Sequence, residues 1–407
     1  MTTERKPDRS AHTDVRSLPP WWPAVLRSAG GVDVEDEAQL RLQLPFLAEL
    51  TAYLNDTGAR QTGTRRYMKD RRLRGAYLLY YTTANMLKPW RALRELRYAG
   101  QLPSSAPLHV LDLGAGPGTG VAGLAALLPD AGAAGTPQAL HVTAVDNVQA
   151  NGAMYAEVAR AVARETGRDI HVETVTADAA KQPRIEGEYD LILAMNLLNE
   201  IPASRRATLL QWCGEHLSDS GHLLLIEPAL RETARALLTL RDAAVEGGWT
   251  VFSPCLRQSD CPALEKDSDW CHDDLPWQRP VFMEMLDEGM GNIKKSLKCS
   301  YMLLNRHGAT LRNALDAPHS DGTLQRVVSE RFDEKGRVWW HMCGEGGRVV
   351  CQRNHRDRTE GNADADRIAR YDIVSLRGEE QRAHDIRIPR EGIVRIVDST
   401  NTFEKQE

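Results

Sequence analysis

The chain has 407 residues, of which 42% are hydrophobic and 26% charged, with 51 basic and 56 acidic residues. This length accommodates about two or three domains, and the net charge of −5 neither requires nor excludes a nucleic-acid partner. No apolar run reaches about 18 residues, and the charged segment 1–16 lacks the apolar core of a signal peptide. We therefore expect a cytoplasmic protein with no membrane partner.

The first hundred residues divide into two parts. Residues 1–34 are rich in proline, serine and charge, which predicts a flexible N-terminus with an aromatic anchor at Trp21 and Trp22. Apolar residues at helical spacing over 35–102 predict an N-terminal helical domain. One helical run carries basic residues among tyrosines, which could contact phosphates and stack on bases or simply form a solvated face: Arg65, Arg66, Lys69, Arg71, Arg72 and Arg74.

Residues 103–252 alternate short apolar runs with helical patterns. This alternation predicts an α/β fold with a Rossmann-like, doubly wound parallel sheet. The expected strands cover 110–113, 140–145, 170–176, 191–195 and 222–226, and the expected helices cover 118–128, 149–165, 203–217 and 231–245. Ligands of such sheets bind beyond the carboxyl ends of the strands, so polar residues that follow each strand are the candidate site.

The first strand runs into a glycine-rich turn within Leu111–Gly120. Glycine tolerates positive φ and lets a ligand approach the backbone, and the next helix offers free N–H groups. The predicted cofactor-binding residues are Asp112, Gly114, Ala115, Gly116, Gly118, Asp146, Asn147, Asp178 and Asn196. Asp146 could accept hydrogen bonds from ribose hydroxyls, while capping or turn formation is the structural alternative for Asp146 and Asp178. Catalytic candidates follow the fourth strand: Asn196, Asn199 and Glu200.

Three cysteines lie in a proline- and aspartate-rich stretch with little periodicity, which we assign to a cysteine-rich module over 253–310. Thiolates at Cys255, Cys261 and Cys271 could bind a soft metal ion or cluster and so order the segment. Cys343 is the favoured fourth ligand, with Cys351 as runner-up and His272 as an alternative for zinc. Spacing alone does not separate zinc from an iron–sulfur cluster, because both accept four thiolates. Cys213 and Cys299 fall in apolar runs and are expected in the core.

The C-terminal region, 311–407, is predicted to be rich in β-strands. Alternating runs at 326–332, 337–342 and 347–352 predict a meander in a small antiparallel, barrel-like appendage, and 386–397 adds one or two strands. Charged edge residues are commonly only solubilising. The alternative is a phosphate-binding rim with Trp339 or Trp340 for stacking, and its basic residues are Arg348, Arg353, His355, Arg356 and Arg358.

The glycine loop together with Asp146 and Asp178 resembles the cofactor motifs of class I S-adenosylmethionine (SAM) methyltransferases. The segment after the fourth strand lacks the Asn/Asp-Pro-Pro-aromatic motif of many amino-group methyltransferases and the Pro-Cys nucleophile used on cytosine C5. Methyl transfer needs mainly alignment, so this difference leaves catalysis open.

From Tyr67 to Arg356, the chain resembles methyltransferase-like small-ribosomal-subunit assembly factors of mitochondria and bacteria. The resemblance rests on the helical segment 67–81, the glycine loop, the segments 196–202 and 224–228, Cys255, Cys261 and Cys271, Ser300–Leu303, and Cys343 with Gly344. It implies a methyltransferase fold, a four-cysteine [4Fe–4S] site and binding to the small ribosomal subunit and its rRNA. A monomer is expected. Two other functions stay open: an active methyltransferase of a small molecule or RNA, and a metal-stabilised binding protein that retains only the fold.

Overall fold

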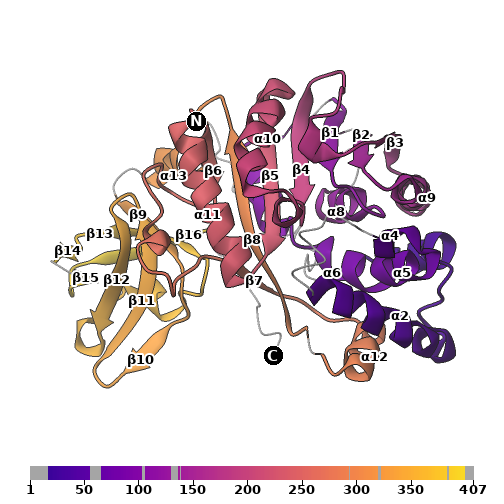
Figure 1. Cartoon of the computed structure of the whole chain (residues 1–407). Coiled ribbons are helices and arrows are strands. Elements are labelled where there is room, and N and C mark those ends of the chain that lie inside the picture. The colour runs from indigo at the N-terminus through magenta and orange to yellow at the C-terminus, as the bar shows by residue number, and fades with distance from the viewer. Residues whose placement is uncertain are drawn as a thin grey trace, which may run out of the picture.

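The computed structural model describes residues 17–55, 66–102, 106–129, 136–137, 139–292, 294–319, 322–382 and 385–398. A central α/β unit carries helices of the N-terminal region on one side and a second sheet, formed by the C-terminal region, at its opposite end (Figure 1). Within the described ranges, no helix combines the length and the apolar character needed to cross a bilayer.

The central sheet has the strand order β3-β2-β1-β4-β5-β8-β6, with β7 also paired to β8. Strands β1 to β5 are parallel, and β8 runs antiparallel to β5, β6 and β7. The predicted α/β fold with a Rossmann-like parallel sheet is confirmed, and the order reverses between β1 and β4, where such sheets bind ligands. The strands are β1 (Leu108–Leu113), β2 (Ala139–Asp146), β3 (Asp169–Thr176), β4 (Tyr189–Met195), β5 (Leu217–Pro228), β6 (Thr250–Ser253), β7 (Asp273–Pro276) and β8 (Ser296–Asn305).

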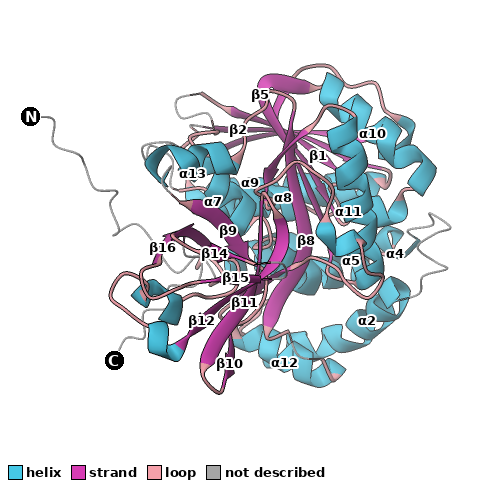
Figure 2. Ribbon diagram, turned by 90° about the vertical axis from the view of Figure 1, so that its left-hand side faces the viewer, coloured by secondary structure: helices cyan, strands magenta, loops and turns pink. Residues whose placement is uncertain are grey.

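Helices cover both faces of this sheet (Figure 2). Alternate residues of β1 enter different cores: Val110 packs with α8 and α9, whereas Leu111 packs with α10 and α11. Because both faces are buried there, the inner strands β1 and β4 are apolar almost throughout, whereas the edge strand β3 is largely polar and exposed. The helices are α8 (Thr119–Leu127), α9 (Gln149–Thr166), α10 (Ala203–Glu215) and α11 (Arg231–Glu246).

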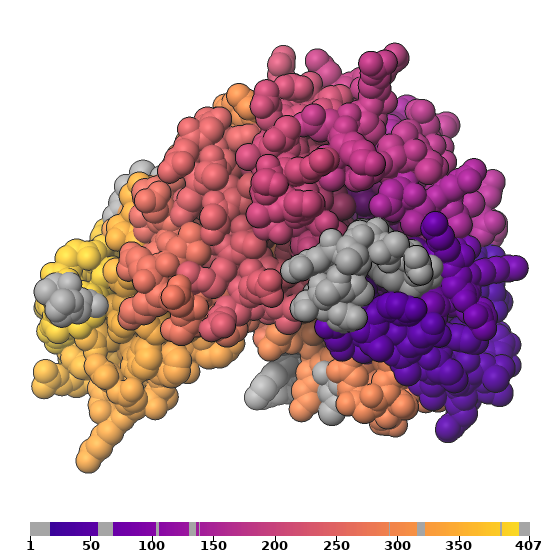
Figure 3. All heavy atoms as spheres, viewed as in Figure 1, coloured from indigo at the N-terminus to yellow at the C-terminus, as the bar shows by residue number. Residues whose placement is uncertain are grey.

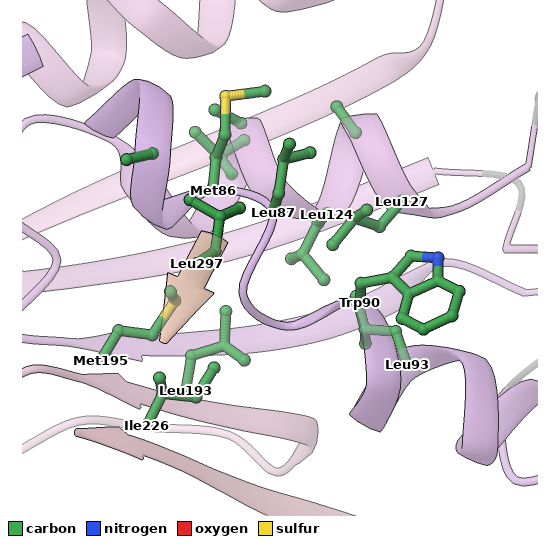
Figure 4. Packing of buried hydrophobic residues seen from close by; sticks show 14 of the residues in the cluster. Met86, Leu87, Trp90, Leu93, Leu124, Leu127, Leu193, Met195, Ile226 and Leu297 are labelled. Atoms are coloured by element: carbon green, nitrogen blue, oxygen red, sulfur yellow. The ribbon is translucent and has the colours of Figure 1, made fainter. Parts of the chain in front are cut away.

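The N-terminal helices pack on the face that carries α8 and α9. Leu87, Trp90 and Leu124 meet in this core together with residues of β4, β5 and β8 (Figure 4). Gly123 permits the close approach, because a Cβ there would lie 2.6 Å from the carbonyl oxygen of Met86. The helices are α1 (Trp22–Val25), α2 (Glu37–Asn55), α4 (Arg66–Lys69), α5 (Arg71–Ala76), α6 (Thr83–Asn85) and α7 (Trp90–Tyr98), with π-helical turns at Leu26–Gly30 and Tyr77–Thr82.

The beginning of the chain differs from the predicted flexible segment 1–34. Residues 1–16 lie outside the described residues, but Trp22–Gly30 is helical and Trp22 is completely buried. The indole Nε1 of Trp22 donates a hydrogen bond of 2.8 Å to Thr83 Oγ1. The predicted aromatic anchor therefore belongs to the core, because a buried tryptophan combines large apolar area with a satisfied N–H donor.

The C-terminal region forms a second sheet with the order β14-β15-β12-β11-β9-β13-β16, and β10 pairs with β11. It is not wholly antiparallel as predicted, because β15 pairs with β12 in the parallel direction. The run predicted over 326–332 is broken: β9 ends at Val327 and β10 begins at Phe332. The strands are β9 (Thr323–Val327), β10 (Phe332–Glu334), β11 (Arg337–Gly344), β12 (Gly347–Asn354), β13 (Ile373–Arg377), β14 (Glu380–Gln381), β15 (Asp385–Arg387) and β16 (Ile393–Asp398).

Two further helices flank the ends of β8. Helix α12 (Val281–Met290) precedes it and packs against α2, and α13 (Leu311–His319) follows it. The space-filling view shows a broad hollow between the C-terminal sheet and the α12 region (Figure 3).

Candidate functional site

The glycine loop connects β1 to α8 at the carboxyl edge of the parallel strands. Gly114 has φ +66° and Gly118 has φ +113°, in the left-handed region that favours glycine. A Cβ on Gly114 would lie 2.8 Å from Leu197 Cδ1, and a Cβ on Gly118 would lie 3.0 Å from Val158 Cγ1. Conformation and contact therefore both require glycine at these two positions.

Asp146, at the end of β2, is buried beneath this loop. Its carboxylate accepts hydrogen bonds from Gly116 N and Val148 N, both 2.9 Å, and from Asn151 Nδ2 at 3.0 Å. Asp146 thus holds the glycine loop in place, and the carboxylate predicted to bind ribose is already engaged by three donors. Together with Asn147 it borders a side cavity of about 300 Å³.

Asp178 borders the same side cavity. Its side chain accepts a hydrogen bond of 3.0 Å from Ala180 N and caps the short helical turn Ala179–Lys181. The capping alternative therefore describes what this carboxylate does in the structure, while its position leaves it beside the cavity.

Asp112 belongs to β1 and lies deep in the wall of the main pocket. Tyr155 donates its hydroxyl to Asp112 Oδ2 at 2.9 Å, and burial raises the pKa of Asp112 to about 7. The carboxylate also lies against helix α8, where a Cβ on Gly120 would overlap its Oδ2. Asp112 is thus an acid held in one orientation with a proton affinity far above that of an exposed aspartate.

The main pocket has a volume of about 850 Å³ and opens beside the glycine loop. It brings together most of the predicted site: Asp112, Gly114, Ala115, Gly116, Asn196, Asn199 and Glu200. Asn196 has φ +56°, an uncommon conformation for a residue other than glycine and one that occurs often at functional sites. Sequence reasoning missed the opposite wall, which includes Tyr77, Tyr81, Asn85, Lys88 and Lys294. Only the packing of the N-terminal helices and α12 brings these residues to the pocket.

Glu227, at the end of β5, fixes the segment that carries the catalytic candidates. Its carboxylate accepts hydrogen bonds from Leu198 N at 2.8 Å, Asn199 N at 3.2 Å and Asn199 Nδ2 at 2.7 Å. Burial raises the pKa of Glu227 to about 7. The amide of Asn199 is therefore held by this acid. The sequence signal for Glu227 was an acid directly after an apolar strand.

A second cavity, of about 370 Å³, lies where the central and C-terminal sheets meet. Cys255, Cys261, Cys271 and Cys343 all line it. Burial raises the pKa of Cys261 to about 11 and that of Cys343 to about 12, which favours neutral thiols in the absence of a ligand. Among the described residues, no group of three or more His, Cys, Asp or Glu side chains is arranged to hold a metal ion.

The alternative fourth cysteine does not reach this cavity. Cys351 lies directly opposite Trp340 in the pairing of β11 with β12, and both are completely buried in the core of the C-terminal sheet. Cys343 lies three residues beyond Trp340, so it points to the other face of the strand. Strand alternation therefore separates Cys343 from Cys351.

Two arginines of α11 hold the loop that carries the cysteines. Arg235 donates to the carbonyl oxygens of Ala263, Lys266 and Asp269 at 3.1, 2.7 and 2.8 Å. Arg241 is buried and donates to two further loop carbonyls, at positions 257 and 259. These bonds order a segment that has few apolar residues of its own.

Buried ion pairs join the three parts of the molecule next to the cysteine cavity. Arg326 of β9 pairs with Glu95 of α7 at 2.8 Å, and Tyr301 of β8 donates to the same carboxylate at 3.0 Å. Arg91 of α7 pairs with Asp273 of β7 at 2.7 Å. An unpaired charge at such depth is costly, so these pairs select one arrangement of the three parts.

The predicted basic rim of the C-terminal region is only partly available. Arg353 is buried and pairs with Asp366, and Trp340 is enclosed in the core, so neither can contact a ligand at the surface. Trp339 stacks on the exposed Phe332 with ring centroids 3.9 Å apart. Arg348 pairs with Asp269 beside the cysteine cavity.

The predicted basic helix face near the N-terminus is also reduced. Arg74 is buried and donates to the carbonyl oxygen of Met68 at 2.6 Å, and Arg72 pairs with Asp70. Arg65 and the side chain of Arg66 lie outside the described residues. Burial thus removes Arg74 from the surface, and the ion pair with Asp70 offsets the charge of the exposed Arg72.

A family profile described as "Mitochondrial small ribosomal subunit Rsm22" matches residues 74–366. The chain belongs to the Rsm22 family. The matched region includes the glycine loop, the catalytic candidates and all four cysteines of the second cavity. A search of curated proteins finds no match.

Solved structures similar to parts of the chain include several methyltransferases. TehB from Haemophilus influenzae is 16% identical over 49% of this chain and 58% of its own, with a TM-score of 0.29. A SAM-dependent methyltransferase from Thiobacillus denitrificans in complex with S-adenosyl-L-homocysteine is 15% identical over 53% and 90%, with a TM-score of 0.31. Magnesium protoporphyrin IX methyltransferase from Synechocystis PCC 6803 with bound SAM is 13% identical over 64% and 97%, also at 0.31. The chain thus spans little more than half of TehB.

Proposed function

We propose that this member of the Rsm22 family binds SAM in the glycine-loop pocket and acts with the small ribosomal subunit in rRNA maturation or translation. The observation that carries the cofactor assignment is the convergence of Asp112, the glycine loop and Asn196 on one cavity at the reversal point of the sheet. The ribosomal part of the proposal is supported by family membership.

The pocket residues suit such a cofactor. A Cβ on Gly116 would meet only the carbonyl oxygen of Gly114, at 3.9 Å, so the backbone at this wall is open to a ligand. Gly116 thus offers a close backbone approach, and Asp112 offers a carboxylate for an amine or hydroxyl group. SAM supplies a methyl group on a positively charged sulfur. Asp146 acts as a positioning residue, because it holds Gly116 N.

Methyl transfer from this pocket is the second candidate function. Asn196, Asn199 and Glu200 share the cavity with the glycine loop, where an acceptor would lie. Their role would be to orient the acceptor against the methyl group, since alignment is the main requirement of the reaction. Incubation of the chain with labelled SAM and immature small subunits, or free RNA, tests this function. If neither the small subunits nor the free RNA becomes labelled, RNA is excluded as the methyl acceptor.

Cofactor binding is tested by calorimetry with SAM. Gly116→Val places a branched side chain at the open wall and should weaken SAM binding at least about tenfold. Gly31→Val is the matched control, because Gly31 also has positive φ but lies outside the pocket. Equal SAM affinity in the two variants would remove the cofactor role of the loop.

We also propose that Cys255, Cys261, Cys271 and Cys343 bind a [4Fe–4S] cluster, with zinc as the alternative. The proposal is supported by the chemistry of the donors, since four thiols line one cavity that arginines also line. Arg241 lies near Cys255 and Cys261, and Arg257 and Arg348 lie near Cys343, so positive charge is available to offset thiolates. When bound, such a group would tie β11 to the loop between β6 and β7.

Iron and sulfide analysis of anaerobically purified protein tests the cluster. Cys343→Ala should lose bound iron, whereas Cys351→Ala, in the neighbouring strand, should retain it. Purified protein that contains zinc and no iron would favour zinc as the bound metal in place of the cluster. Equal iron content in the two variants would contradict the assignment of Cys343.

Association with the ribosome is tested by sedimentation with small subunits. The chain should co-sediment with immature 30S-type particles and not with large subunits. Phe332→Ala, which removes the exposed ring stacked on Trp339, tests whether the C-terminal sheet contributes to that contact. A chain that sediments with neither particle would contradict the ribosomal role.

A further inference from the structure

Two lysines from distant parts of the sequence line the glycine-loop pocket. Lys88 lies in the turn before α7, and Lys294 follows α12. Burial, together with the positive charge of Lys88, lowers the pKa of Lys294 to about 8. Burial also lowers the pKa of Lys88. The two lysines therefore share one pocket, and both side chains are half-buried.

Lys294 is held at three points. Its backbone N donates to Asp287 Oδ2 at 2.9 Å, and its carbonyl oxygen accepts from Trp277 Nε1 at 2.9 Å. Its Nζ lies 4.9 Å from the ring centroid of Tyr80 and 5.4 Å from that of Tyr81. The faces of aromatic rings attract cations, so the two tyrosines hold the ammonium group in place.

The backbone of Lys88 is also fixed. Its backbone N donates to Asn85 O at 3.0 Å, and the neighbouring residues Met86 and Leu87 are buried in the main core (Figure 4). The segment cannot shift without disturbing that core. The backbone of Lys88 therefore stays in place beside the pocket.

Within the described part of the chain, neither lysine has a dedicated counter-ion. Among the described residues, no carboxylate forms an ion pair with Lys88 or Lys294, although Glu227 and Asp287 act on them from a distance. The carboxylate of Asp287 is occupied by Tyr80, Arg279 and the backbone N of Lys294. Two partly buried cations that share a pocket wall without an ion pair are costly unless an anion joins them.

We propose that Lys88 and Lys294 form an anion subsite of the glycine-loop pocket that takes a carboxylate or phosphate group of the bound ligand. The inference rests on the proposed function, since it concerns the same pocket. Two sources have this chemistry: the methionine carboxylate of the cofactor and a phosphate of a nucleotide acceptor. Lysine suits either one, because it binds anions as a compact point charge.

The test compares Lys88→Met and Lys294→Met in the full chain with Lys295→Met. Lys295 is the matched control, because it is exposed and lies outside the pocket. Calorimetry measures binding of S-adenosylhomocysteine and of methylthioadenosine, which lacks the methionine carboxylate. Phosphorus NMR measures binding of inorganic phosphate to the chain loaded with S-adenosylhomocysteine, and thermal unfolding checks that each variant is folded.

A subsite for the cofactor carboxylate predicts that both pocket variants bind S-adenosylhomocysteine at least about tenfold more weakly, while methylthioadenosine affinity stays within about twofold. A subsite for an acceptor phosphate predicts unchanged S-adenosylhomocysteine affinity and a loss of phosphate binding of at least about tenfold. Pocket variants that match Lys295→Met with every probe, or that lose both nucleosides equally, overturn the inference.

The proposed cofactor role can fail separately. If the wild-type chain binds neither nucleoside, that role is wrong, and inorganic phosphate is then titrated into the unloaded chain. If the wild-type chain binds phosphate, and Lys88→Met and Lys294→Met abolish this binding while Lys295→Met retains it, the anion subsite is still supported. No phosphate binding by the wild-type chain overturns it.

Discussion

Gly120→Ala is the sharpest test of how the glycine loop is built. A Cβ at this position would lie 2.8 Å from Asp112 Cγ and closer still to its Oδ2, so the carboxylate has to move. Overpacking of this kind costs about 1–3 kcal/mol, and displacement of Asp112 also endangers its hydrogen bond from Tyr155, which contributes about 1 kcal/mol. The higher helix propensity of alanine stabilises the variant by about 1 kcal/mol and so offsets part of this cost.

The expected net destabilisation is therefore about 1–3 kcal/mol, or a fall in Tm of about 2–10 °C for a domain of this size. Gly75→Ala is the control, since Gly75 is also helical but a Cβ there would meet only Gly30 O, at 4.0 Å. Thermal unfolding of the two variants measures the difference, and SAM affinity should fall only in Gly120→Ala. If both variants unfold at the same temperature, the contact between α8 and Asp112 does not require glycine at position 120.

Three other predictions concern charge and loop order. The pKa of Asp112 is raised to about 7, so the folded state keeps a proton that the unfolded state releases near pH 4. Stability should therefore fall as pH rises from about 4 to 7. Asp112→Asn should flatten this part of the plot of Tm against pH, and an unchanged slope would contradict the raised pKa of Asp112. Arg326→Met leaves Glu95 buried without its ion-pair partner and should lower the free energy of unfolding by about 3–5 kcal/mol, measured with denaturant. The double variant with Glu95→Gln should recover part of that loss. If the effects of the two substitutions on the free energy of unfolding simply add, the residues do not form a direct pair. Arg235→Met removes the bonds that hold the cysteine loop and should speed proteolysis within 254–272, whereas cleavage at the wild-type rate would show that other contacts suffice.

The amino-acid sequence by itself determined the central sheet and the place of its pocket. Apolar runs that alternate with helical patterns specify parallel strands, and a glycine turn after the first of them specifies an open backbone at the sheet edge. Asp112 and Asn196 were found because they belong to, or directly follow, strands whose carboxyl ends meet at that edge. These are local signals, and they need no knowledge of distant contacts.

Tertiary structure alone decided the features that depend on register or on distant packing. Cys343 and Cys351 look alike in sequence, but the pairing of β11 with β12 places Cys351 beside Trp340 in the core and leaves Cys343 facing the second cavity. Lys88 and Lys294 become neighbours only when α12 packs against the N-terminal helices. Strand register and helix packing are set by the sum of many weak contacts along the chain, so no short stretch of sequence reports them.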